Sequence, residues 1–242
     1  MIRVLVNGYK GKMGQEVVRA VKADPILELV GETDLGDDLA AMIKRSNAQV
    51  VVDFTTAQAG LKNTEIILQA GVSPVIGTSG FKEADVQKLR ALAAEKHLGG
   101  VIAPNFAIGA VLMMRFAQEA AKYFPEAEIL EIHHGGKADS PSGTAIRTAE
   151  LIAAARETHP AGREEVAILP GARGADLNGV RIHSSRLSGY VAKQQVLFGG
   201  SGQTLTITHD SNHRESFMPG VCKACKEVVK RKELFYGLEH LL

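Results

Sequence analysis

The sequence is poor in cysteine, has no excess of charge of one sign and contains no long apolar segment. Only two of its 242 residues are cysteines, which excludes a fold held together by many disulfides. Lys and Arg total 28 against 27 for Asp and Glu, so the chain as a whole offers no field that would attract nucleic acid or an acidic membrane. We therefore expect a small-molecule partner, no nucleic acid and no membrane.

Neither a secretion signal nor a membrane span is recognisable. Residues 1–6 enter a strand pattern at once, without a charged leader or a cleavage site. No apolar stretch approaches the roughly 18 residues that a membrane helix needs. Hydrophobic residues make up 45% of the chain, which is ample for a packed core. The sequence thus predicts a soluble protein of the cytoplasm.

The two cysteines, Cys222 and Cys225, stand in a Cys-x-x-Cys spacing, which also occurs in redox pairs and zinc sites. No second pair accompanies them, and residues 220–229 have the period of a helix with both thiols on its apolar face. Core packing is favoured over redox or metal chemistry.

Strands and helices alternate through the first hundred residues. Apolar runs typical of strands lie at residues 2–6, 27–32, 50–54, 75–77 and 101–103, and helical periodicity lies at 15–22, 39–44, 61–70 and 83–96. Parallel neighbours need crossover connections. The alternation therefore predicts an α/β fold, a Rossmann-like doubly wound parallel sheet with helices on both faces.

After residue 106 the pattern changes. Helices are expected at 108–123 and 143–156, and strands at 127–133, 180–187, 190–198 and 203–208. Turn signals separate the last three strands. These features predict a second, α+β domain with a mixed or antiparallel sheet. A final helix at 219–230 is expected to return to the first domain, which gives domains of 1–106 with 215–242, and of 107–214.

Three glycines, Gly8, Gly11 and Gly14, follow the first strand and open the first helix in a G-x-x-G-x-x-G spacing. Glycines there allow a tight turn, the approach of backbone N–H groups to a pyrophosphate, and close packing of helix on strand. A glycine turn that serves only the fold is the alternative. The strand before and the helix after the loop favour dinucleotide binding.

An acid that binds the ribose hydroxyls is expected about twenty residues further on. Glu32 and Asp34 stand at the end of the second strand, and Asp34 is preferred. An acid there favours NAD, whereas Lys10 and Lys12 could pair with a 2′-phosphate, although each lysine alone is more often a solvated surface charge. The sequence supports both NADH and NADPH and leaves the preference open.

The densest group of reactive side chains lies in residues 132–145. His133 and His134 end an apolar strand, where side chains alternate, so their rings should point in opposite directions unless the backbone bends. One ring can then serve chemistry and the other substrate or structure. No third ligand has a recognisable spacing, so a metal site is not expected.

Residues 141–144 have the pattern of a helix start, with Ser142 or a neighbour as its cap. Outward N–H groups of Gly143 and Thr144, with Lys137 nearby, would suit a carboxylate. Without the histidines and the lysine, an ordinary capped helix would be an equal alternative. The cluster predicts a site that binds a small dicarboxylate and protonates an atom beside the reacting centre.

Residues 131–145 resemble the signature of dihydrodipicolinate reductases, Glu-x-His-His-x-x-Lys-x-Asp-Ala-Pro-Ser-Gly-Thr-Ala. The resemblance covers essentially the whole chain, because it extends to the glycine loop and to residues 53–56, 77–81, 103–106 and 216–220. Ser140 stands for the usual Ala, Ser79 for the usual Thr, and Gly135-Gly136 for bulkier residues. The glycine pair predicts a mobile loop in the absence of substrate.

The resemblance implies reduction of 4-hydroxy-tetrahydrodipicolinate to tetrahydrodipicolinate, in the diaminopimelate route of lysine biosynthesis. NADPH or NADH would deliver hydride to ring C4 as the hydroxyl is lost; whether the ring binds hydroxylated or already dehydrated stays open. His133 receives an acid/base role and Lys137 the role of proton donor. The implied substrate-binding residues are His134, Lys137, Ser142, Gly143 and Thr144. The implied cofactor-binding residues are Gly8, Tyr9, Lys10, Gly11, Lys12, Met13, Asp34, Gly77, Thr78, Ser79, Ala103, Pro104, Asn105 and Phe106.

The resemblance also implies a homotetramer that assembles through the sheets of the second domain, and domains that close over bound ligands. Two other functions fit parts of the sequence. A non-catalytic sensor of nicotinamide dinucleotides would use the first domain, but it needs neither a proton donor nor a dicarboxylate site. A reductase related to aspartate or homoserine dehydrogenases would lack the His-His-x-x-Lys signature.

Overall fold

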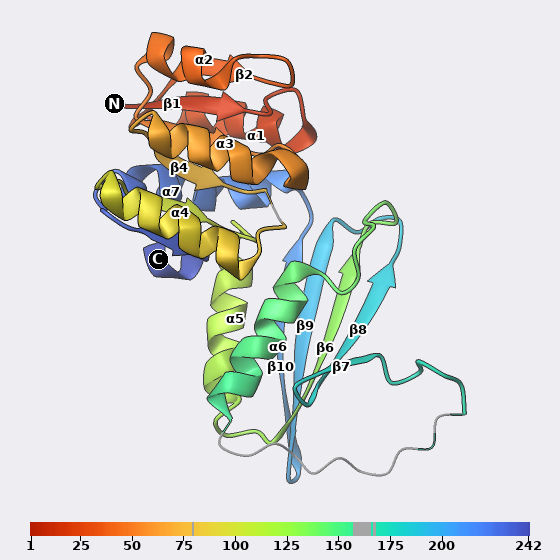
Figure 1. Cartoon of the computed structure of the whole chain (residues 1–242). Coiled ribbons are helices and arrows are strands. Elements are labelled where there is room, and N and C mark those ends of the chain that lie inside the picture. Colours follow the sequence, from red (N-terminus) through yellow and green to blue (C-terminus); the bar gives the residue numbers. More distant parts are fainter. Residues whose placement is uncertain (79, 157–165, 167) are drawn as a thin grey trace. The chain divides into compact units, whose positions relative to one another are not determined.

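The computed structural model describes residues 1–78, 80–156, 166 and 168–242, which belong to two compact units (Figure 1). Unit 1 comprises Met1–Ile108 and Arg214–Leu242, and unit 2 comprises Gly109–His213. None of the helices in the described ranges has the length and apolar character required to cross a membrane.

Unit 1 is built on a six-stranded sheet in the order β11-β5-β4-β3-β1-β2, with every pairing parallel. Its elements are β1 (Ile2–Asn7), α1 (Lys12–Ala23), β2 (Leu27–Thr33), α2 (Leu39–Ser46), β3 (Val50–Asp53), α3 (Ala57–Gln69), β4 (Ser73–Ile76), α4 (Glu83–Glu95), β5 (Gly100–Ile102), η1 (Arg214–Phe217), α7 (Met218–Val228), β11 (Leu234–Tyr236) and η2 (Leu238–Leu241). Strand order reverses direction at β1, with β2 on one side and β3 on the other. The predicted doubly wound sheet is confirmed.

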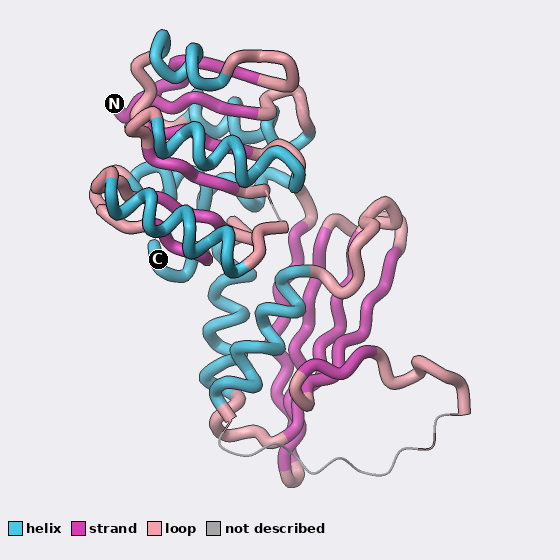
Figure 2. The backbone as a smooth tube through the Cα atoms, in the orientation of Figure 1, coloured by secondary structure: helices cyan, strands magenta, loops and turns pink. Residues whose placement is uncertain are grey.

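Helices cover both faces of this sheet, which makes its central strands fully buried. The helices α2, α3 and α4 pack in a row on one face, and α1 packs with α7 on the other (Figures 1 and 2). All four residues of β3 are buried, and three of them are valines. A strand covered on both faces needs apolar side chains in both directions, which is why its first three residues are apolar.

The C-terminal elements complete unit 1. The helix α7 packs on α1 and buries Cys222 and Cys225, both free thiols. Burial raises the pKa of both thiols, which disfavours the thiolate that redox or zinc chemistry requires. The prediction of core packing is confirmed. The strand β11 was not predicted, and it adds to the sheet beside β5.

Unit 2 contains a five-stranded mixed sheet in the order β10-β9-β6-β8-β7. Its elements are α5 (Ile108–Ala120), which begins at the last residue of the first segment of unit 1, β6 (Glu126–His133), α6 (Gly143–Ala155), β7 (Ala175–Leu177), β8 (Val180–Arg186), β9 (Ala192–Gly200) and β10 (Gln203–Ser211). The helix α6 packs against β6, β7 and β8. The second α+β fold is confirmed.

The turn signals suggested that the three strands within residues 180–208 would pair in sequence order as antiparallel neighbours. The structure shows a different order. The hairpin of β9 and β10 forms, but β6 lies between β8 and β9 and runs parallel to β8. The chain passes through α6 between β6 and β8, which supplies the crossover that a parallel pair needs. Turn residues mark where the chain reverses, and they do not specify which strand becomes its neighbour.

Candidate active site

The glycine loop lies at the carboxyl edge of the parallel sheet, between β1 and α1. Gly8 has a φ of 86°, and a Cβ there would lie 2.9 Å from the carbonyl oxygen of Phe54. A Cβ at Gly14 would overlap the carbonyl oxygen of Gly8. The amide of Gly11 donates to that same oxygen at 3.1 Å. The loop is therefore held tight against the start of the segment after β3, and the first turn of α1 begins at the strand-order reversal.

Asp34 lies directly beside this loop. Its Oδ2 accepts a hydrogen bond from the backbone N–H of Lys10 at 2.9 Å, and its Oδ1 accepts one from Leu35 at 2.8 Å. These backbone bonds lower the pKa of Asp34. Glu32, the other candidate, forms an ion pair with Lys22 at 3.6 Å instead. Of the two candidate acids, Asp34 is the one that contacts the loop.

A buried carboxylate, Asp53, joins the carboxyl ends of neighbouring strands. Its Oδ2 accepts from the side-chain amides of Asn7 (2.7 Å) and Asn63 (2.8 Å). Its Oδ1 accepts from the hydroxyls of Thr55 (2.7 Å) and Thr78 (2.9 Å) and from the backbone N–H of Thr55 (3.0 Å). Five donors thus converge on one side chain, which connects the end of β1, the loops after β3 and β4, and α3.

The remaining predicted nucleotide segments lie at the same edge of the sheet. Gly77 follows β4 and packs so closely on the ring of Phe54 that a Cβ would overlap it. Ala103 follows β5, and its N–H donates to Ile76 at 2.9 Å. Phe106 is buried, with its ring 5.7 Å from that of Phe54. Thr78 binds Asp53, whereas Ser79 lies outside the described residues.

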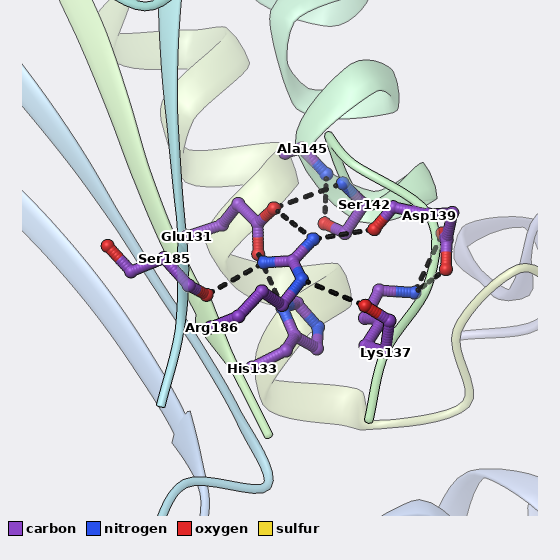
Figure 3. A network of polar contacts seen from close by, with 8 residues as sticks. All are labelled: Glu131, His133, Lys137, Asp139, Ser142, Ala145, Ser185 and Arg186. Carbon is purple, nitrogen blue, oxygen red and sulfur yellow. Dashed lines mark hydrogen bonds and ion pairs between the residues drawn. The ribbon is translucent and has the colours of Figure 1, made fainter. Parts of the chain in front are cut away.

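In unit 2, Glu131 connects His133 to the helix start. Its side chain is completely buried. One oxygen contacts His133 Nδ1, and the other accepts from the backbone N–H of Ser142 at 3.3 Å (Figure 3). Burial alone would raise the pKa of Glu131, but hydrogen bonds from His133, Arg186 and Ser184 outweigh it and lower the pKa to about 2. Glu131 is an ionised carboxylate that fixes the Nδ1 edge of the His133 ring.

Arg186, at the end of β8, pairs with Glu131 through two parallel hydrogen bonds of 3.0 Å. Its remaining N–H groups donate to backbone carbonyls of Lys137 (3.3 Å), Asp139 (2.6 Å) and Ser185 (2.7 Å). Figure 3 shows the guanidinium between Glu131 and the loop that carries Lys137. The loop is thus attached to the sheet through its backbone.

The ammonium of Lys137 contacts both carboxylate oxygens of Asp139 at 2.7 Å. Asp139 has 64% of its side chain exposed, against 22% for Lys137. Burial acts to raise the pKa of Asp139, but the hydrogen bond from Lys137 prevails and lowers it. An exposed partner of this kind can be exchanged for another carboxylate.

Ser142 caps α6, as predicted. Its hydroxyl oxygen accepts from the backbone N–H of Ala145 at 3.2 Å. Gly143 is exposed and Thr144 half-buried in the first turn, where a helix cannot satisfy its own N–H groups. The positive end of the helix dipole there favours an anion.

The structure brings the predicted side chains together in two sets, one in each unit. The nucleotide-type residues share the carboxyl edge of the unit 1 sheet. In unit 2, Glu131 and Arg186 connect His133 and the loop of Lys137 to Ser142, next to Gly143 and Thr144 at the start of α6. Sequence reasoning missed Asp53, Glu131 and Arg186 as contributors. In the described part of the chain, no group of three or more His, Cys, Asp or Glu is arranged to hold a metal.

This fold and these side chains define an oxidoreductase whose first unit has the architecture of pyridine-nucleotide-binding domains. The model for the N-terminus of dihydrodipicolinate reductase matches residues 2–106, and the model for its C-terminus matches residues 109–242. The chain therefore belongs to the dihydrodipicolinate reductase family. The resemblance of its signature is confirmed.

Relatives of known name match along the full length. A 4-hydroxy-tetrahydrodipicolinate reductase of Enterococcus faecalis is 49% identical, with 100% of each chain covered. One of Streptococcus gordonii is 51% identical, with 100% of this chain and 99% of that protein covered. The dipicolinate-bound dihydrodipicolinate reductase from Paenisporosarcina sp. TG-14 is 45% identical, has a TM-score of 0.88 and is covered completely, as is this chain.

Proposed function

We propose that the protein reduces 4-hydroxy-tetrahydrodipicolinate to tetrahydrodipicolinate in the diaminopimelate route of lysine biosynthesis. The observation that carries the proposal is the cluster in unit 2, where Glu131 and Arg186 connect His133, the loop of Lys137 and the start of α6. Relatives that share about half of their residues with this chain bear the name of this activity. A related structure binds dipicolinate, a ring with two carboxylates.

The residues of unit 1 fit a dinucleotide. Gly8 and Gly14 stand where a Cβ would overlap the protein's own backbone, so they allow the tight turn and the close packing of helix on strand that dinucleotide-binding loops need. The backbone N–H groups of Gly8 to Gly11 already donate within the protein. Those of Lys12 and Met13, in the first turn of α1, would therefore bind the pyrophosphate, and Asp34 would bind the ribose. Residues Gly77, Thr78 and Ser79 and the segment of Ala103, Pro104, Asn105 and Phe106 would hold the rest. When bound, NADPH or NADH supplies the hydride that ring C4 receives as the 4-hydroxyl leaves.

Residues in and beside the glycine loop favour different cofactors. Asp34 favours the unmodified ribose of NADH by charge and by hydrogen bonding. Lys10 and Lys12 are exposed in the loop and would pair with the 2′-phosphate of NADPH. We therefore propose that both cofactors are used.

The proton chemistry falls to unit 2. Glu131 contacts His133 through Nδ1, so Nε2 is the ring nitrogen left to accept or donate a proton in the acid/base role. Loss of the 4-hydroxyl as water also removes a proton from the adjacent ring carbon. Lys137 Nζ would return a proton to that carbon when C4 receives hydride, after a substrate carboxylate replaces Asp139 as the partner of the ammonium. His134, Ser142 and the first-turn N–H groups of Gly143 and Thr144 would bind the substrate carboxylates.

The test is oxidation of NADPH and of NADH by purified protein. Substrate is generated in place from pyruvate and aspartate semialdehyde by the preceding synthase. We expect substrate-dependent oxidation that falls by at least roughly 100-fold in Lys137→Ala, because general-acid catalysis is lost. Tight binding of dinucleotide without any oxidation would contradict the proposal and support the sensor.

We also propose that the protein is a homotetramer of the cytoplasm, assembled through the sheets of unit 2. The residues of β6 that face α6, such as Ala127 and Ile129, are buried, whereas Leu130 and Ile132 on the other face are only partly covered. Leu197 on the neighbouring β9 is 41% exposed. An apolar sheet face of this kind supports association with a second copy.

A further inference from the structure

We propose that Glu131 and Arg186 are positioning residues for the reaction: together they set the His133 ring and the loop of Lys137 in their relative places. The proposal rests on the function proposed above. Glu131 determines the position of His133 by a side-chain contact, and Arg186 determines that of Lys137 through the backbone (Figure 3). One ion pair thereby connects the proposed acid/base to the proposed proton donor.

Every N–H group of the Arg186 side chain has an acceptor. Its side chain carries five N–H groups, and each makes a bond: two to Glu131, and three to the carbonyls of Lys137, Asp139 and Ser185. Glu131 is equally occupied, because each oxygen accepts from Arg186 and also contacts His133 or the N–H of Ser142. A lysine at position 186 would have three donors on one atom and could not reproduce this planar pattern.

Stability alone does not account for the pair. A buried ion pair is often no more stabilising than apolar side chains of the same volume. Here two of the Arg186 bonds go to the loop and one Glu131 contact goes to His133, so the charges are used where the proposed chemistry takes place. Loss of the pair is expected to displace His133 and Lys137 from their relative positions. A displacement of reacting groups by about 1 Å can lower a rate roughly 100-fold.

The same strand offers a matched control. Glu128 of β6 also binds one arginine and one histidine, Arg173 at 2.6 Å and His183 at 2.8 Å. The bonds of Glu128 thus lead to Arg173 and His183, whereas those of Glu131 lead to His133, Arg186 and Ser142. Glu128→Gln therefore removes a carboxylate with the same kinds of partner, and it is expected to leave kcat/KM unchanged.

The experiment compares Arg186→Lys, Glu131→Gln and Glu128→Gln, each with and without Lys137→Ala. Steady-state oxidation of NADH gives kcat and KM for the substrate, and fluorescence titration gives the Kd for NADH. We expect Arg186→Lys and Glu131→Gln to lower kcat/KM roughly 100-fold. The Kd for NADH should stay within about twofold. The substituted residues belong to unit 2 and the proposed dinucleotide residues to unit 1, and substitutions at one site leave an independent site unaffected. In the Lys137→Ala background the same substitutions should cost less than about tenfold, because residues that act as a unit are not additive.

Several results would overturn the inference. One is full activity of both variants; another is an equal loss with and without Lys137; a third is an equal loss in Glu128→Gln. If Arg186→Lys fails to fold, as judged by its thermal unfolding, Glu131→Gln carries the test, since it keeps the volume of the side chain. Failure of the proposed function is distinct, because the wild type would then oxidise no NADH with substrate.

Discussion

Glu131 combines complete burial with a full negative charge, and this combination makes the stability of unit 2 depend on pH. Its pKa is about 2 in the folded protein against an ordinary value of 4.5, so its contribution is complete above pH 4.5 and is lost as the pH falls toward 2. The contribution amounts to roughly 3 kcal/mol. We expect the difference in unfolding free energy between wild type and Glu131→Gln to shrink over this range, measured by urea unfolding. A difference that does not change with pH would contradict this assignment.

Gly135 is a residue whose replacement should be tolerated. Its φ is not in the left-handed region, and a Cβ there would meet nothing within 4 Å. Because Arg186 fixes the carbonyls of Lys137 and Asp139, the predicted mobility should concentrate in residues 134–136. Gly135→Ala is expected to stabilise the protein by roughly 0.5 kcal/mol, since it restricts the unfolded chain.

Hydrogen exchange measured without substrate tests this prediction. Amides of residues 134–136 should exchange faster than those of β6 and α6 in the wild type, and more slowly in Gly135→Ala than in the wild type. Gly202→Ala is the matched control. Gly202 has a φ of 70°, where a side chain is strained, so this substitution should destabilise the protein. Exchange in the loop no faster than in its flanks would count against the mobile loop.

At the scale of the element, Asp53 holds the strand ends that carry the nucleotide segments. Both carboxylate oxygens of Asp53 accept hydrogen bonds. In Asp53→Asn, either orientation of the amide would therefore place an NH2 group against other donors. We expect a loss of roughly 3 kcal/mol in unfolding free energy and weaker binding of NADH. Thr64→Val is the control, since Thr64 is buried but bonds only within its own helix. If Asp53→Asn is destabilised but binds NADH as tightly as the wild type, Asp53 contributes to stability and not to the dinucleotide site.

Elements with a local signal could be predicted, and those defined by distant partners could not. The glycine loop and the Ser142 cap each depend on a few consecutive residues, so the sequence contains their whole pattern. Glu131 and Arg186 lie 55 residues apart, and nothing near either residue indicates the other. The strand β11 has only three residues, too few to show a period. The parallel pairing of β6 with β8 is likewise set by the path of the chain between them.

For the whole molecule, the two units separate the proposed tasks, and assembly is expected to involve unit 2. Leu197→Lys places a charge on the sheet face that is proposed to meet another copy, where an unpaired charge is costly to bury. We expect this variant to elute as a smaller species than the wild-type tetramer when mass is measured by light scattering after gel filtration. Phe116→Lys is the control, because Phe116 is an even more exposed apolar side chain, on α5. A wild type that is monomeric throughout, or a Leu197→Lys tetramer as stable to dilution as the wild type, would contradict assembly through this face.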